Sequence, residues 1–138
     1  FTAATPAMHL PEKAVVEKAQ QEALTTGAHI QLTSDPVEGV KDAHVVYTDV
    51  WVSMGQENSR DTKMKAFDGF QVNTKLMSYA KPTAIFMHCL PAHRGEEVTD
   101  EVMDSPQSIV FEQAENRLHS QKAILTFLLQ KRPKRSRM

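Results

Sequence analysis

Three short polar clusters carry the residue types that are best suited to chemistry in this 138-residue chain. The first starts at Asp49 and continues through Ser53, Met54 and Gly55. A carboxylate holds an ammonium group, and the backbone amides of a loop of small residues hold a carboxylate. An α-amino acid offers both charges at one carbon, so this cluster suits such a ligand. A helix cap followed by a turn explains the same residues, and the residues alone leave both interpretations open.

The second cluster is the run His88, Cys89, Leu90 and Pro91. A histidine beside a cysteine is one arrangement of a nucleophile, but neither a glycine-rich elbow nor a third catalytic group lies nearby in sequence. We expect His88 to donate a hydrogen bond to a carbonyl or phosphate oxygen instead. Leu90 precedes a proline, which favours an extended backbone with the Leu90 carbonyl directed into a cleft. A small cysteine buried behind a strand is the competing structural interpretation.

The third cluster, Glu115, Asn116 and Arg117, falls near the start of a predicted helix. The helix dipole favours anions at that end, and an arginine can bind a carbonyl or phosphate oxygen through two hydrogen bonds. An exposed charge pair in the first turn explains this cluster equally well. With one cysteine and no histidine pair at i, i+4, the chain is a poor candidate for a zinc site.

The elements that must position these clusters alternate between strand and helix. Hydrophobic spacing, prolines and caps predict strands at 1–5, 29–33, 45–47, 84–87 and 108–111, and helices at 11–25, 36–41, 60–67, 74–80 and 113–129. Such alternation predicts an α/β fold with a doubly wound parallel sheet and helices on both faces. Ligands of these sheets bind beyond the carboxyl ends of the strands. All three clusters are therefore predicted on one rim of the sheet.

Composition narrows the function classes and the domain organisation. A net charge of −1 gives no indication of a nucleic-acid or membrane partner, and no apolar run reaches the ~18 residues that span a bilayer. The single cysteine excludes an internal disulfide and favours a reducing, cytoplasmic setting. We expect one domain at 1–130, followed by a basic, disordered tail at 131–138.

The three clusters together resemble the C-terminal motifs of ornithine carbamoyltransferases. The resembling runs are DVWVSMGQE at 49–57, HCLP at 88–91 and ENR at 115–117, and the resemblance extends from Phe1 to about Gln130. It implies the Rossmann-like, ornithine-binding C-terminal domain of that family, as a partial chain without the domain's first strand and helix. Aspartate carbamoyltransferases carry a proline where Cys89 stands and lack the Ser-Met-Gly loop.

This family transfers the carbamoyl group of carbamoyl phosphate to the δ-amine of L-ornithine, giving citrulline and phosphate. By resemblance, Asp49 would bind the ornithine α-ammonium, and the loop of Ser53 and Met54 would bind its carboxylate. The remaining roles fall on the other two clusters: Cys89 and the Leu90 carbonyl would position the δ-amine and border the carbamoyl phosphate site, and His88 and Arg117 would polarise the carbamoyl carbonyl.

The resemblance also implies a cytoplasmic homotrimer or larger homo-oligomer in arginine biosynthesis or catabolism, with no metal or organic cofactor and no nucleic-acid or membrane partner. The family's Ser-x-Arg-Thr-Arg and His-Pro-x-Gln motifs are absent from these residues, so we expect the chain to be inactive by itself. Two alternatives stay open: a non-catalytic, ornithine-binding remnant of the same fold, and a carbamoyltransferase for a related amine.

Overall fold

The computed structural model describes residues 1–52, 55 and 57–130. Short parallel strands alternate with helices, as the sequence predicts, and the α/β class is confirmed. The strands are β1 (Thr2–Ala4), β2 (Gln31–Thr33), β3 (Val45–Thr48) and β4 (Ile85–His88). The helices are α1 (Lys13–Thr26), α2 (Pro36–Val40), α3 (Arg60–Ala66), α4 (Thr74–Met77), α5 (Asp100–Met103) and α6 (Val110–Leu129), with 3-10 turns η1 (Ala7–His9) and η2 (Glu57–Ser59).

The strands form two parallel pairs in the described part of the chain, β1 with β2 and β3 with β4, where one continuous sheet was expected. No strand of the described residues joins the two pairs. In the second pair, Val45 lies opposite Ile85 and Thr48 lies opposite His88. This register brings the carboxyl ends of β3 and β4 side by side.

The predicted strand at 108–111 is wrong. Only one residue of it, Ser108, forms a parallel bridge with Phe86, through the Phe86 N–H to the Gln107 carbonyl and the Ile109 N–H to the Phe86 carbonyl. The chain then enters α6, whose first residue, Val110, is buried in the core. Packing of this β-branched side chain in a helix overrides its local preference for a strand.

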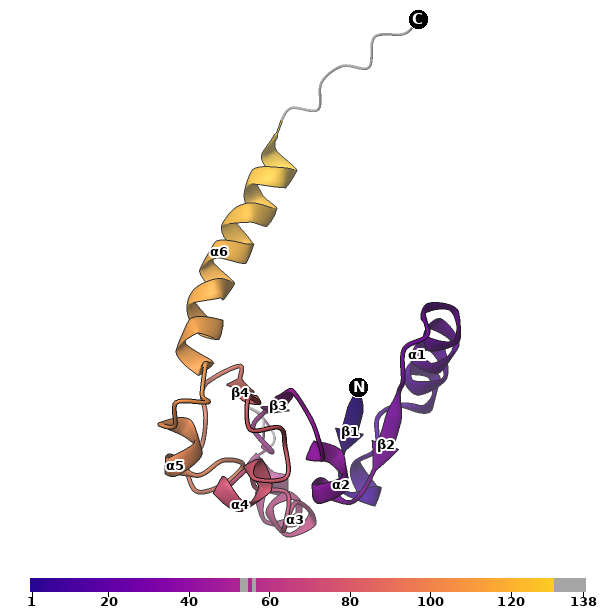
Figure 1. The fold of residues 1–138 in the computed structure, drawn as a ribbon, viewed down its shortest axis with the longest axis vertical. Coiled ribbons are helices and arrows are strands. Elements are labelled where there is room, and N and C mark those ends of the chain that lie inside the picture. Colours follow the sequence, from indigo (N-terminus) through magenta and orange to yellow (C-terminus); the bar gives the residue numbers. More distant parts are fainter. Residues whose placement is uncertain (53–54, 56, 131–138) are drawn as a thin grey trace, which may run out of the picture.

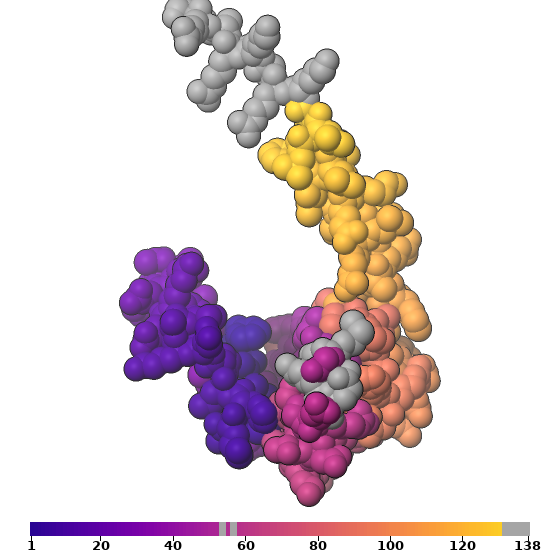
Figure 2. Space-filling model, turned by 180° about the vertical axis from the view of Figure 1, so that it is seen from behind, coloured from indigo at the N-terminus to yellow at the C-terminus, as the bar shows by residue number. Residues whose placement is uncertain are grey.

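The main core surrounds β3 and β4. Its most deeply buried apolar side chains are Ala84, Phe86, Val98, Val102 and Val110. In Figure 1, β1, β2, α1 and α2 form an N-terminal lobe beside this core, and α6 projects away from it. The space-filling view in Figure 2 shows open space between the N-terminal lobe and α6, on one side of the molecule.

Local sequence signals explain several of the element boundaries. The side chains of Asp35 and Asn73 accept hydrogen bonds from the Val37 and Leu76 amides, and these caps begin α2 and α4. Gly27 ends α1 with a φ of 72°, a conformation that glycine adopts readily. None of the helices in the described ranges is long and apolar enough to cross a membrane.

Candidate active site

The first two polar clusters meet where β3 and β4 end. Because Thr48 lies opposite His88, the next residues, Asp49 and Cys89, leave adjacent strand ends on the same side of the sheet. The Cys89 Sγ donates a hydrogen bond to Asp49 Oδ1 at 3.0 Å. The same carboxylate oxygen accepts the Val50 N–H at 2.7 Å. An acceptor-only group is thus held at the rim with a thiol beside it.

Helix α6 brings part of the third cluster to the same rim. It begins directly after the bridge between Phe86 and Ser108, so Arg117 stands about two turns along it. Arg117 Nη2 donates a hydrogen bond to the Cys89 carbonyl at 3.2 Å. Glu115 does not join this group: it is exposed and lies 3.5 Å from His119 on its own helix.

Tyr47 is a member of this group that the sequence analysis missed. It stands two residues before Asp49, so strand alternation points both side chains to one face of the sheet. Partial burial raises the pKa of Tyr47, and a hydrogen bond with Cys89 adds to the rise, while a hydrogen bond with Gln113 of α6 opposes it. The strand periodicity was the signal that identifies this residue.

The surroundings of the Cys89 thiol favour its protonated form. Burial raises its pKa, and its hydrogen bond to the Asp49 carboxylate raises it further, whereas a hydrogen bond with Tyr47 acts in the opposite direction. A protonated thiol is a hydrogen-bond donor and a weak nucleophile. The local electrostatics therefore favour a positioning role for Cys89 over covalent chemistry.

His88 points to the other side of its strand and is completely buried. Its Nδ1 accepts the Leu90 N–H at 2.9 Å, and its Nε2 lies 3.3 Å from Oε1 of Glu97, which is also completely buried. His88 therefore does not share the exposed face of Asp49, Cys89 and Arg117. Its expected hydrogen bond to a substrate oxygen stays a prediction.

The expected extended backbone at Leu90 is wrong. Its φ is 56°, in the left-handed region, and the bond from Leu90 to Pro91 is cis. The hydrogen bond from the Leu90 N–H back to the His88 side chain closes a tight local turn, which outweighs the general preference of a residue before proline. Cys89 and Leu90 thus leave the strand in a bent conformation.

The loop after Asp49 is described only in part. Ser53 and Met54, the expected carboxylate-binding residues, lie outside the described residues. Gly55 is exposed with a φ of 85°, which fits the turn expected there. Before the loop, Trp51 stacks on Phe67 with ring centroids 5.5 Å apart, and Phe67 also contacts His9 at 5.2 Å. This aromatic stack links the loop to the N-terminal lobe.

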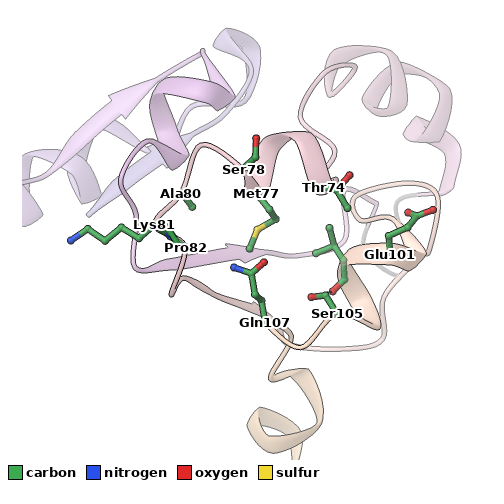
Figure 3. A pocket seen from close by; sticks show the side chains of 10 residues that line it. Thr74, Met77, Ser78, Ala80, Lys81, Pro82, Glu101, Ser105 and Gln107 are labelled. Atoms are coloured by element: carbon green, nitrogen blue, oxygen red, sulfur yellow. The ribbon is translucent and has the colours of Figure 1, made fainter.

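Two other features of the described residues could hold a ligand. His93, Glu96 and Glu97 bring three potential metal-binding atoms within 4.8 Å of one another, but Arg60 already pairs with Glu96 and His88 faces Glu97. A hollow of about 360 Å³ lies between α4, α5 and the start of β4, at the opposite end of the strands from Asp49. In Figure 3, Lys81 extends away from this hollow. Its Nζ lies 2.8 Å from the Nε2 of His44.

Comparison with known proteins identifies the family. Residues 1–128 match the family described as "Aspartate/ornithine carbamoyltransferase, Asp/Orn binding domain". The chain belongs to this family. It is 56% identical, over 126 residues, to the ornithine carbamoyltransferase of Thermococcus kodakarensis, which covers 91% of this chain and 40% of the relative. The chain therefore spans about two fifths of the length of the curated relatives that it matches.

Solved carbamoyltransferase structures share the fold. The ornithine carbamoyltransferase of Pyrococcus furiosus superposes with a TM-score of 0.84 at 56% identity, covering 91% of this chain and 40% of that one. The anabolic ornithine carbamoyltransferase of Campylobacter jejuni gives a TM-score of 0.88 at 44% identity, covering 93% and 42%. The region that matches the carbamoyltransferase family includes all three polar clusters.

Proposed function

We propose that this chain supplies the ornithine side of an ornithine carbamoyltransferase, which transfers the carbamoyl group of carbamoyl phosphate to the δ-amine of L-ornithine. The observation that carries the proposal is the convergence of Asp49, Cys89 and Arg117, from two strand ends and one helix, through hydrogen bonds of 3.0 and 3.2 Å. The family match and the names of the relatives support it.

The two charged groups on the α-carbon of ornithine are proposed to bind to protein groups of opposite character. Asp49 offers a carboxylate to the α-ammonium, and the loop that contains Ser53 and Met54 is proposed to bind the α-carboxylate. The δ-amine then reaches the Cys89 thiol and the Leu90 carbonyl. A protonated thiol is a weak nucleophile, so the unprotonated δ-amine itself attacks the carbamoyl carbon.

The carbamoyl group is proposed to lie between the amine and Arg117. As the δ-amine attacks the carbamoyl carbon, negative charge grows on the carbamoyl oxygen, and a guanidinium stabilises it through charge-assisted hydrogen bonds. The bond from that carbon to the phosphate oxygen then breaks, the amine nitrogen loses a proton, and phosphate leaves as citrulline forms. Catalysis is then mainly orientation and electrostatic stabilisation. His88 contributes in this proposal from behind the site, because it is buried and binds the Leu90 amide.

The remaining expectations follow the family. We propose a cytoplasmic homotrimer or larger homo-oligomer in arginine metabolism, with L-ornithine and carbamoyl phosphate as ligands. No step in this scheme calls on a metal or organic cofactor, a nucleic acid or a membrane. Residues 1–130 form the ornithine-binding domain in this proposal, and the function of 131–138 is left open.

A chimaeric enzyme tests the proposal. Residues 1–128 would replace the matching region of the Pyrococcus furiosus relative, and phosphate release together with the carbamoylated product would be measured with L-ornithine, N-acetyl-L-ornithine, L-aspartate and putrescine. Ornithine should give the highest kcat/KM, since N-acetyl-L-ornithine lacks the α-ammonium, putrescine lacks the α-carboxylate, and L-aspartate lacks the δ-amine. Preference for another amine would assign a different substrate, and ornithine binding without citrulline would support the non-catalytic remnant.

A further inference from the structure

A completely buried carboxylate, Glu97, lies behind the site and has no part in the chemistry above. Burying a carboxylate is costly unless its oxygens accept hydrogen bonds. Its Oε1 accepts the His93 N–H at 2.6 Å and lies 3.3 Å from His88 Nε2. Neither His88 Nε2 nor Glu97 Oε2 has a hydrogen-bond partner in the described residues, and Glu97 Oε2 lies 4.0 Å from His93 Nδ1. The 3.3 Å contact with Glu97 Oε1 therefore places a carboxylate beside a buried ring nitrogen of His88 that has no other hydrogen-bond partner in the described residues.

The hydrogen bond at Nδ1 indicates which tautomer a neutral His88 adopts. Its Nδ1 accepts the Leu90 N–H, so that nitrogen carries no proton. A neutral imidazole then has its proton on Nε2, which faces Glu97. A carboxylate accepts hydrogen bonds only, so Glu97 favours this tautomer over the one with a proton on Nδ1. With the proton on Nδ1, His88 would place an N–H donor against the Leu90 N–H, and neither group could accept.

The peptide group between Cys89 and Leu90 is held at both of its polar atoms. Arg117 donates to its carbonyl oxygen, and His88 Nδ1 accepts from its N–H. Two partners on opposite sides of the strand thus fix the plane of one peptide. That plane sets the direction of the Cys89 side chain on one side and of the Leu90 carbonyl on the other.

We propose that Glu97 is a positioning residue that acts through His88 to fix the Cys89–Leu90 peptide. The assignment of the δ-amine of ornithine as the group that contacts this peptide rests on the proposed function. The position of Glu97 is itself well held: its carbonyl accepts the Val72 N–H at 2.9 Å, and Val72 bridges to Val98. Nearby, Arg94 binds both Asp100 and Asp104, which anchors the segment that carries Glu97.

Three variants separate this role from a merely structural one. Glu97→Leu removes the acceptor, Glu97→Gln keeps an acceptor oxygen, and Glu96→Gln changes the neighbouring carboxylate as a matched control. The ring ¹⁵N shifts of His88, assigned from a His88→Gln variant, report the tautomer in the 138-residue chain. We expect a protonated Nε2 in the unmodified chain, in Glu97→Gln and in Glu96→Gln. A protonated Nδ1 in the unmodified chain would overturn the proposal and requires no folded variant.

Alkylation of Cys89 reports the position of the peptide, because it is the chain's single cysteine. Glu97→Leu should change the alkylation rate by roughly threefold or more, since exposure and pKa control that rate. Glu97→Gln should restore most of it, and Glu96→Gln should leave it unchanged. Circular dichroism would check that each variant folds; if Glu97→Leu does not, the tautomers of the unmodified chain and of Glu97→Gln still decide. Equal rates in folded Glu97→Leu and the unmodified chain would contradict the proposal.

The chimaeric enzyme adds a kinetic readout. Glu97→Leu should lower kcat/KM for ornithine by about tenfold, the scale expected for a misplaced reacting group, and Glu97→Gln should recover it. If the unmodified chimaera makes no citrulline, the proposed function fails, while the tautomer and alkylation results still decide the role of Glu97. A full loss of activity in Glu97→Gln with an unchanged tautomer would contradict action through His88.

Discussion

Cys89 donates a hydrogen bond to Asp49 across 3.0 Å, which joins the ends of two neighbouring strands that are 40 residues apart in sequence. Burial raises the pKa of the Cys89 thiol, and this contact with the Asp49 carboxylate adds to the rise. Arg117 holds the carbonyl of the same cysteine from helix α6. Cys89 is therefore the residue at which the three polar clusters of the chain meet, and its reactivity reports on all of them.

Replacing Asp49 with asparagine should make Cys89 more reactive. Burial is the largest cause of the raised pKa of the Cys89 thiol, and the Asp49 carboxylate is the second. Removal of the carboxylate therefore lowers that pKa. At a fixed pH below the pKa, a fall of one unit increases the thiolate fraction about tenfold. Iodoacetamide labelling should accelerate, and its pH profile should shift to lower pH. Asp61→Asn on α3 is the control, and an unchanged or slower reaction in Asp49→Asn would be inconsistent with this electrostatic link.

Replacing Tyr47 with phenylalanine should make Cys89 less reactive, the opposite of the effect expected for Asp49→Asn. The hydrogen bond from Tyr47 lowers the pKa of Cys89, so its loss raises that pKa and slows labelling at the same pH. Tyr79→Phe, on a residue outside the cluster, serves as the matched control. The two variants together test the direction of each contact, because a general loosening of the site would speed labelling in both.

Replacing Arg117 should weaken the binding of carbamoyl phosphate more than the binding of ornithine. In the chimaeric enzyme, Arg117→Ala should lower kcat/KM by about 100-fold, the scale for loss of one donor to a developing oxyanion. It should raise the KM of carbamoyl phosphate more than that of ornithine, and Asp49→Ala should do the reverse. Glu115→Gln, two residues away and exposed, should leave both constants near their original values. Equal rises of both constants in each variant would refute this division of roles.

Gly39 permits close packing in the N-terminal lobe. A Cβ atom on this residue of α2 would lie 2.6 Å from the Ala4 Cβ of β1, closer than side chains approach. Gly39→Ala should therefore lower the free energy of unfolding by about 1–3 kcal/mol, the usual cost of overpacking, as measured by urea denaturation. The double variant Ala4→Gly/Gly39→Ala relieves the contact and should recover part of the loss; equal destabilisation by both would point to a different cause.

Short-range sequence patterns predicted the positions of most helices and strands. Helices start at Pro36 and Thr74 as predicted, where the side chains of Asp35 and Asn73 cap them. The apolar runs at 45–47 and 84–87 predicted the strands whose ends meet in the structure. The convergence of Asp49 and Cys89 follows from that register. Arg117 joins them because α6 starts at the bridge beside β4 and two helical turns reach the rim.

Long-range contacts decided what the sequence did not predict. Glu97 lies in a segment without periodicity, and the backbone bridge between Val72 and Val98 is what brings it to His88. The left-handed conformation of Leu90 depends on the same histidine. The residues at 108–111 have strand-like composition, but the burial of Val110 starts a helix there. In each case a tertiary partner outweighed a local preference.

The most direct test of the central claim is the protection of Cys89 by ornithine. In the chimaeric enzyme with carbamoyl phosphate present, the alkylation rate of the Cys89 peptide would be followed by mass spectrometry with and without saturating L-ornithine. Ornithine bound between Asp49 and Cys89 should slow the reaction by about tenfold or more, since a covered thiol is not accessible to the reagent. Equal rates with and without ornithine, at a concentration that supports citrulline formation, would show that Cys89 does not line the ornithine site.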